Sequence, residues 1–127
     1  MVLRATTRIG NGRILVVEDE AHIRLGLVTL LEDAGLDVLD AADADEALHL
    51  LADHPDVRIL LTDIQMPGSM DGLHLAHRVR ELWPDVGLML MSGNLNMPTH
   101  LMPDRSFYIE KPLDRRRLIS AIASFGG

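Results

Sequence analysis

The sequence contains no cysteine and few aromatic residues. The absence of cysteine excludes disulfide bonds, thiolate metal sites and thiol nucleophiles, and it is compatible with the reducing cytoplasm. No apolar run approaches the roughly 18 residues of a membrane-spanning helix. Positive charge is also scarce, because 12 Lys and Arg against 19 Asp and Glu give a formal net charge of −7. Such a balance argues against nucleic acid as the main partner. We therefore expect a cytoplasmic protein that binds neither nucleic acid nor a membrane.

The length of 127 residues suits one compact domain. Residues 1–12 have no sustained periodicity and end in Gly-Asn-Gly, so we expect a flexible leader there. The domain itself is expected over 13–125, with no second domain for DNA binding or another output on this chain.

Five short apolar runs alternate with stretches of helical periodicity. Short continuous runs between helical patterns are typical of buried parallel strands. A regular alternation of strands and helices predicts an α/β fold, with a doubly wound five-stranded parallel sheet covered on both faces. The expected strands are 14–17, 36–41, 57–61, 86–91 and 107–109.

Apolar residues three or four positions apart predict the helices between these strands. Gly35 is expected to end the first helix, and Asp43 and Glu46 have capping-box spacing at the start of the second. Pro55 and Pro84 lie just beyond the second and third helices. The apolar faces contain Ile23, Leu27, Leu30, Leu31 and Ala34 in the first helix, Leu75, Ala76, Val79 and Leu82 in the third, and Leu118, Ile119, Ile122, Ala123 and Phe125 in the last.

The connection between the fourth and fifth strands differs from the others. Between residues 92 and 107 it contains two prolines, two asparagines and a glycine. Proline removes a helical hydrogen bond and glycine disfavours the helix, so we expect a short or irregular helix of one or two turns at most.

Polar side chains follow the predicted strands. Glu18 and Asp19 come after the first strand, Asp63 after the third, Ser92 after the fourth and Lys111 after the fifth. The carboxyl ends of parallel strands meet at one edge, where ligands bind near the topological switch point. Crowded carboxylates repel each other, which raises at least one pKa unless a cation intervenes. Oxygen ligands without histidine or cysteine suit Mg²⁺. With the lysine and serine, this edge has the groups needed for phosphoryl transfer to an aspartate.

Four sets of residues resemble the receiver domain of two-component response regulators, over about residues 13–125. The resemblance implies a flavodoxin-like (βα)₅ fold. It also implies a signalling module rather than a metabolic enzyme. Such a module catalyses only its own phosphorylation from a donor and the slow hydrolysis of its own phosphoryl group. The matching segments are ILVVEDE (14–20), LLTDIQMP (60–67) with MDG (70–72), MSG (91–93) and EKP (110–112).

The resemblance assigns a role to each polar residue at the strand ends. It implies that Asp63 is the phosphoacceptor and that Lys111 contacts the phosphoryl group. Glu18 and Asp19 would hold Mg²⁺ together with Asp63 and the backbone carbonyl of Gln65. Three further implied features are Ser92 as the switch hydroxyl, Tyr108 as the aromatic that changes rotamer with it, and a cis peptide bond before Pro112.

The implied partners are a sensor histidine kinase or a phosphotransfer protein, together with a downstream protein target, and a weak homodimer is compatible with the family. The chain departs from the usual family pattern in its proline-broken fourth connection, which in the family contributes to the face that reads out phosphorylation, and at three further positions. The first acid is Glu18, the switch residue Ser92 lacks the methyl group of threonine, and the loop after Pro67 has one residue more than usual. The extra residue alters the path from Asp63 to the third helix.

Two alternatives stay open from the sequence. A receiver-like binding module that acts without phosphorylation is favoured by the irregular fourth connection and the extra loop residue. A phosphohydrolase of the haloacid dehalogenase type also uses a strand-end aspartate, but it needs a second acid two residues later, where this chain has Gln65. We interpret His74 and His77 as surface histidines rather than metal ligands, and Arg115–Arg117 as either a solvated face or a partner contact.

Overall fold

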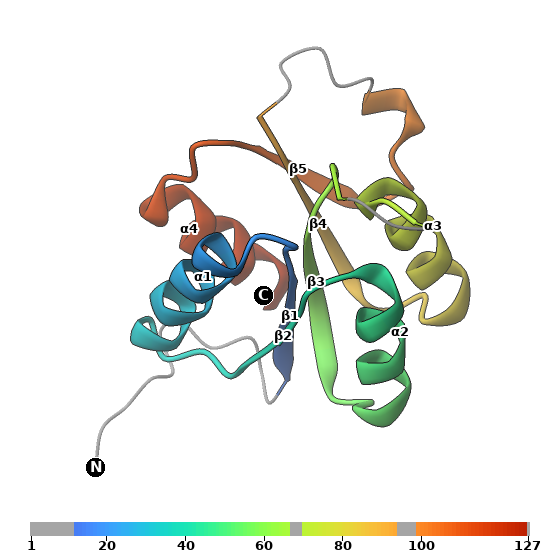
Figure 1. The fold of residues 1–127 in the computed structure, drawn as a ribbon, viewed down its shortest axis with the longest axis horizontal. Coiled ribbons are helices and arrows are strands. Elements are labelled where there is room, and N and C mark those ends of the chain that lie inside the picture. Colours follow the sequence, from blue (N-terminus) through green and yellow to red (C-terminus); the bar gives the residue numbers. More distant parts are fainter. Residues whose placement is uncertain (1–11, 67–69, 94–98, 127) are drawn as a thin grey trace.

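The computed structural model describes residues 12–66, 70–93 and 99–126 (Figure 1). Nearly all of the predicted leader and the loop after Pro67 therefore lie outside the described residues. None of the described helices has the length and apolar character needed to cross a membrane. The elements are β1 (Arg13–Val17), α1 (Ala21–Asp33), β2 (Val38–Ala41), α2 (Ala44–Asp53), β3 (Val57–Asp63), α3 (Gly72–Leu82), β4 (Gly87–Ser92), η2 (Thr99–Leu101), β5 (Ser106–Glu110) and α4 (Arg115–Gly126).

The strands form one five-stranded sheet in the order β2-β1-β3-β4-β5, and every neighbouring pair is parallel. This arrangement confirms the predicted doubly wound fold. The chain order reverses between β1 and β3, which makes the crevice at their carboxyl ends the topological switch point.

The sheet separates two apolar layers (Figure 1). Side chains alternate between the two faces of a strand. In β1, Ile14 and Val16 pack in the layer of α1 and α4, whereas Leu15 and Val17 pack in the layer of α2 and α3. Because both faces are covered, the central strands β1, β3 and β4 are largely apolar and buried, whereas the edge strands β2 and β5 also contain polar residues.

The strand bounds differ from the predicted ones by one or two residues, and the two largest differences have a clear physical reason. β2 begins at Val38 rather than at residue 36, because Leu36 completes the end of α1. Its N–H donates to the Leu31 carbonyl at 3.1 Å, and Gly35 has a positive φ of 92°, which together form a Schellman motif. β3 continues to Asp63 rather than ending at residue 61, so the aspartate is the last residue of the strand.

Three residues placed on apolar helix faces are exposed. Ile23 and Leu82 keep 43% and 50% of their surface in solvent, and Ala123 is also exposed. Ile23 lies in the first turn of α1 and Leu82 is the last residue of α3. Fewer neighbouring elements lie within reach at a helix end, and apolar periodicity does not carry that information.

In the described part of the fourth connection, one 3₁₀ turn, η2, is the only helical element. This agrees with the predicted short or irregular helix, although residues 94–98 lie outside the described residues. Two side chains of α3 bind the backbone of this connection. His77 Nε2 donates to the Leu101 carbonyl at 2.6 Å, and Arg80 Nη2 donates to the carbonyls of Asp104 and Arg105 at 3.1 and 3.3 Å.

The start of α3 gives a pH-dependent prediction. Asp71 Oδ1 accepts hydrogen bonds from the N–H and the ring Nδ1 of His74, at 2.9 and 2.8 Å. Burial raises the pKa of Asp71, but these hydrogen bonds and the charge of His74 outweigh it, so the pKa lies below its ordinary 3.8. Such a carboxylate stabilises the fold above pH 3.8 and loses this contribution as the pH falls through the lowered pKa.

We expect Asp71→Ala to lower the free energy of unfolding by about 1 kcal/mol at neutral pH, which is the usual value of an N-cap. The penalty should shrink when urea denaturation is repeated at acid pH, below the lowered pKa of Asp71. An equal penalty at both pH values would contradict the titration of this cap.

Candidate functional site

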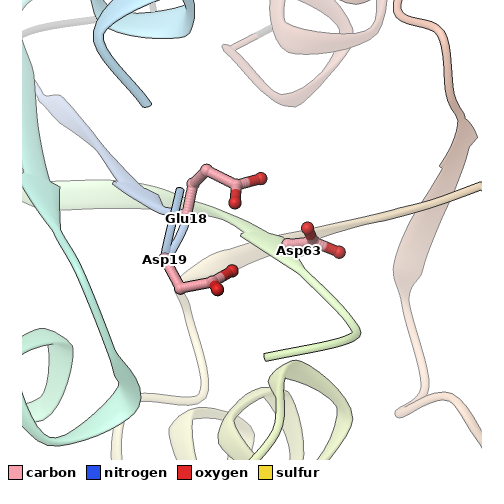
Figure 2. A group of neighbouring side chains, drawn as sticks. All are labelled: Glu18, Asp19 and Asp63. Atoms are coloured by element: carbon pink, nitrogen blue, oxygen red, sulfur yellow. The ribbon is translucent and has the colours of Figure 1, made fainter. Parts of the chain in front are cut away.

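Three carboxylates meet at the switch point (Figure 2). Glu18 and Asp19 follow β1, and Asp63 ends β3. The strand register brings these ends together, because Val17 of β1 pairs with Thr62 of β3. One carboxylate oxygen from each residue lies within 4.8 Å of the others. Glu18 and Asp63 are only 1% and 5% exposed, so two of these acids are withdrawn from solvent.

This donor set fits Mg²⁺, which binds hard oxygen ligands and keeps several of its waters. The three carboxylates supply only anionic oxygens, and Asp19 is exposed, which leaves one side of the group open to water. Gln65 lies two residues beyond Asp63, and its N–H donates to Asp63 Oδ1 at 3.2 Å. These residues would hold the ion, with the Gln65 carbonyl as the additional ligand that the family resemblance implies.

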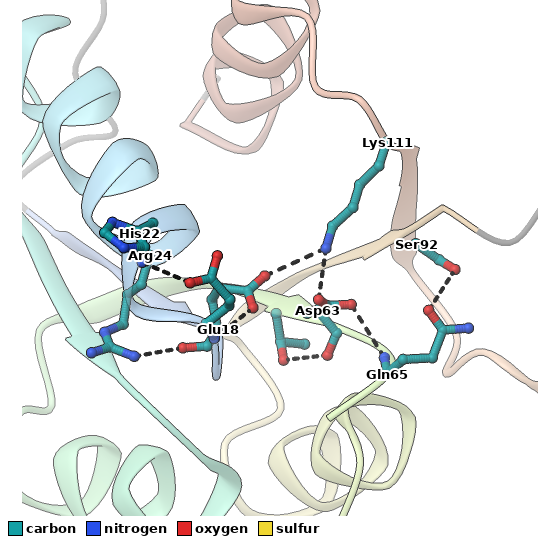
Figure 3. A network of polar contacts seen from close by, with 9 residues as sticks. Glu18, His22, Arg24, Asp63, Gln65, Ser92 and Lys111 are labelled. Atoms are coloured by element: carbon teal, nitrogen blue, oxygen red, sulfur yellow. Dashed lines mark hydrogen bonds and ion pairs between the residues drawn. The ribbon is translucent and has the colours of Figure 1, made fainter. Parts of the chain in front are cut away.

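Lys111, the residue after β5, approaches the same carboxylates (Figure 3). Its Nζ lies 2.7 Å from Asp63 Oδ2 and 3.4 Å from Glu18 Oε1. Burial lowers the pKa of Lys111, but the hydrogen bond and charge of Asp63, together with Glu18, outweigh it and raise the pKa. The ammonium group therefore stays charged beside Asp63. The peptide bond between Lys111 and Pro112 is cis.

Glu18 has a raised pKa, as predicted for at least one of the carboxylates, but burial contributes more to it than crowding does. Burial raises the pKa of its carboxyl group, and the neighbouring Asp63 raises it further. Two contacts oppose the rise: the Glu20 N–H donates to Glu18 Oε2 at 3.0 Å, and Lys111 supplies a positive charge. The net effect is a raised pKa, so the protonated form of the Glu18 carboxyl group is favoured relative to a carboxyl group in water.

Ser92 and Tyr108 lie on the neighbouring strands β4 and β5. Ser92 is the last residue of β4, is fully buried, and donates its hydroxyl to Gln65 Oε1 at 3.3 Å (Figure 3). The Tyr108 hydroxyl donates to the backbone carbonyl of Ser92 at 3.4 Å. The Lys111 N–H donates to the same carbonyl at 2.9 Å. The structure thus brings all the polar residues of the predicted site to one edge of the sheet.

Two residues of this edge had no assigned role in the sequence analysis. Arg24 of α1 donates from Nη1 to the Glu18 carbonyl at 2.8 Å, and its Nε pairs with Asp40 Oδ2 at 3.1 Å. Gly72 begins α3 against the end of β3, and its N–H donates to the Ile64 carbonyl at 2.8 Å. The glycine in the MDG segment was an available signal for this contact. No local pattern in the sequence predicts the contact between Arg24 and the Glu18 carbonyl.

The other polar side chains considered from the sequence lie apart from this site. His74 pairs with Asp71 and His77 binds the Leu101 carbonyl, and both are exposed. Over residues 12–66, 70–93 and 99–126, the acidic trio of Glu18, Asp19 and Asp63 is the one group of three or more potential metal-ligating side chains. Arg115–Arg117 are exposed at the start of α4.

Comparisons with known proteins agree with this geometry. A family model, the response regulator receiver domain, matches residues 14–123. The chain is 38% identical over 114 residues to the response regulator receiver protein CpdR of Brucella abortus (strain 2308), covering 87% of this chain and 92% of CpdR. It is 32% identical over 125 residues to the sensor kinase CckA of the same strain, covering 95% of this chain but only 13% of CckA.

Solved structures show the same fold. The response regulator protein TrrA of Thermotoga maritima, in complex with Mg(2+)-BeF, matches with a TM-score of 0.78 and 25% sequence identity, covering 90% of this chain and 98% of TrrA. The family match extends over β1 to α4, and the acids, serine and lysine of the predicted motifs lie together at the strand ends. The chain therefore belongs to the response regulator receiver domain family of two-component systems.

Proposed function

We propose that Asp63 accepts a phosphoryl group from the phosphohistidine of a sensor histidine kinase or phosphotransfer protein, in a Mg²⁺-dependent reaction. One observation carries the proposal. Asp63 Oδ2 lies 2.7 Å from Lys111 Nζ, while carboxylate oxygens of Asp63, Glu18 and Asp19 lie within 4.8 Å of one another. The Asp63 carboxylate, which would be the nucleophile, therefore lies beside both the Lys111 ammonium group and the carboxylate oxygens that would bind the metal.

In the proposed transfer, a carboxylate oxygen of Asp63 attacks phosphorus. The new O–P bond forms as the N–P bond to the histidine ring breaks, and the electron pair of that bond returns to the ring nitrogen. The Lys111 ammonium group stabilises the negative charge on the transferring oxygens. Mg²⁺ held by Glu18, Asp19, Asp63 and the Gln65 carbonyl would supply further charge neutralisation. The complex of TrrA with Mg(2+)-BeF supports this assignment by similarity.

The proposed product is a signalling state rather than a metabolite. The aspartyl phosphate would be lost by slow self-catalysed hydrolysis, and signalling would proceed through contacts with a downstream protein. We propose residues 13–125 as the receiver and the cytoplasm as its location.

The two alternatives make different use of the same residues. A binding module that acts without phosphorylation needs neither the Lys111–Asp63 pair nor the acidic trio, and their close approach favours the phosphoacceptor. A haloacid dehalogenase reaction needs an acid at position 65. Gln65 instead has an amide that accepts from Ser92, and it cannot act as a general acid.

Incubation with acetyl phosphate and Mg²⁺ tests the proposal. We expect intact-mass spectrometry to show the addition of one phosphoryl group to the unmodified chain and none to Asp63→Asn. Asp53→Asn, which changes an exposed aspartate at the end of α2, is the matched control and should be labelled like the parent. Full labelling of Asp63→Asn would refute Asp63 as the acceptor. An unlabelled parent chain would favour the binding module.

A further inference from the structure

We propose that the side chain of Gln65 is a positioning residue, which holds the Ser92 hydroxyl in the unphosphorylated chain and opposes its transfer to a phosphoryl group on Asp63. The inference rests on the proposed phosphorylation of Asp63. It adds a regulatory role for the side chain of Gln65, a residue for which only the backbone carbonyl was given a function above.

Gln65 contacts both residues that would have to change partners. Its backbone N–H donates to Asp63 Oδ1 at 3.2 Å, and its side-chain Oε1 accepts from Ser92 Oγ at 3.3 Å (Figure 3). Asp63 and Ser92 end the adjacent strands β3 and β4, and Asp63 pairs with Met91, the residue before Ser92. Gln65 therefore links Asp63, at the end of β3, to the buried Ser92, at the end of β4.

A serine hydroxyl has one proton to donate. While that proton is donated to Gln65 Oε1, it is not available to a phosphoryl oxygen on Asp63. Phosphorylation replaces a neutral acceptor with a charged one, and hydrogen bonds to charged acceptors are stronger. Ser92 is therefore expected to leave Gln65 when Asp63 is phosphorylated.

The geometry makes this restraint weak enough to be reversed. The separation of 3.3 Å is long for a hydroxyl donor. Gln65 is exposed, so water can take the place of the hydroxyl once it leaves, whereas Ser92 is fully buried. Substitutions of the Gln65 side chain also retain the backbone carbonyl proposed to bind Mg²⁺, which separates the restraint from the metal site.

The test measures binding of beryllofluoride, a phosphoryl analogue, to the full chain with saturating Mg²⁺. Four proteins are compared: the parent, Gln65→Leu, Ser92→Ala and the double variant. Leucine has a similar size but no acceptor. We expect Gln65→Leu to lower the apparent Kd about fivefold, the fold-change for loss of one neutral hydrogen bond. In the Ser92→Ala background the same substitution should have no effect, and the Mg²⁺ affinity of each of the four proteins is measured so that all are compared at saturating metal.

An effect of Gln65→Leu that is equal with and without Ser92, or no effect in either background, overturns the inference. Gln65→Met, a second variant without an acceptor, excludes a peculiarity of leucine. If the parent does not bind beryllofluoride, the proposed function fails, and the restraint is judged without a ligand from the χ1 couplings of Ser92 by NMR. One rotamer in the parent and averaging in Gln65→Leu supports it, whereas the same rotamer in both proteins overturns it.

Discussion

Replacing Lys111 with methionine is expected to slow the proposed phosphorylation of Asp63 by about 100-fold, the usual effect of removing one group that stabilises transition-state charge. The ammonium group lies 2.7 Å from Asp63 Oδ2 and 3.4 Å from Glu18 Oε1. Lys111 is the only lysine in the sequence. The rate of labelling by acetyl phosphate, followed by intact-mass spectrometry, measures the effect.

The same substitution should have the opposite effect on metal binding. Lys111 competes with a metal cation for two carboxylates, so its removal is expected to tighten Mg²⁺ binding by about tenfold, or about 1.4 kcal/mol. Titration calorimetry measures this affinity. Arg58→Met is the matched control, because it removes one positive charge from an exposed residue near the start of β3, at the other end of the strand from Asp63. Slower phosphorylation with unchanged Mg²⁺ affinity would contradict the competition.

The free energy of unfolding at two pH values provides an independent measure of the interaction between Lys111 and the two carboxylates. Without metal, Lys111→Met leaves the largely buried Glu18 and Asp63 without their ammonium partner, which should cost about 2–3 kcal/mol of unfolding free energy at neutral pH. Burial and Asp63 already raise the pKa of Glu18 above its ordinary 4.5, and loss of the ammonium raises it further. Relative to the unfolded chain, a carboxyl group with a raised pKa contributes stability to the folded state below pH 4.5. This contribution is lost as the pH rises through the raised pKa. Urea denaturation should therefore show a smaller penalty at pH 5 than at pH 7.

The sequence predicted the fold and the meeting of Asp63 with Lys111 for one physical reason. Short apolar runs separated by helices require parallel strands, and parallel strands place the residues that follow them on one edge. This topology was enough to predict that two residues 48 positions apart in sequence lie at the same edge, whereas their contact at 2.7 Å depends on side-chain conformations that the topology does not determine. The apolar run from 57 to 61 ended the predicted strand too early, because Thr62 and Asp63 are polar yet still pair with β4.

Contacts that depend on helix rotation or on loop geometry could not be predicted. Arg24 reaches the Glu18 carbonyl only because α1 presents that side chain to the end of β1. The bond between Ser92 and Gln65 depends on how the chain turns after β3. Neither geometry leaves a periodic pattern in the sequence, so both were absent from the predicted site.

Gly72→Ala is expected to be the most disruptive single-methyl change near the site. A Cβ atom at this position would lie 1.9 Å from the Asp63 carbonyl oxygen and 2.8 Å from the Ile64 Cα. These neighbours are backbone atoms of the strand end, so they cannot move aside by changing a rotamer. Either α3 shifts away from β3 or the carbonyl of Asp63 moves. We expect a loss of about 3 kcal/mol of unfolding free energy, the upper end of the usual cost of overpacking.

The control is the same substitution in an open position. Gly26 lies in the interior of α1 with nothing within 4 Å of a Cβ atom, so Gly26→Ala should raise the unfolding free energy by about 0.5–1 kcal/mol. Urea denaturation of both variants separates the steric effect from helix propensity, because alanine is favoured at both positions on propensity alone. Gly72→Ala should also be labelled more slowly by acetyl phosphate, since the carbonyl that must move belongs to Asp63 itself. A Gly72→Ala variant as stable and as reactive as the parent would show that α3 does not hold the end of β3 in place.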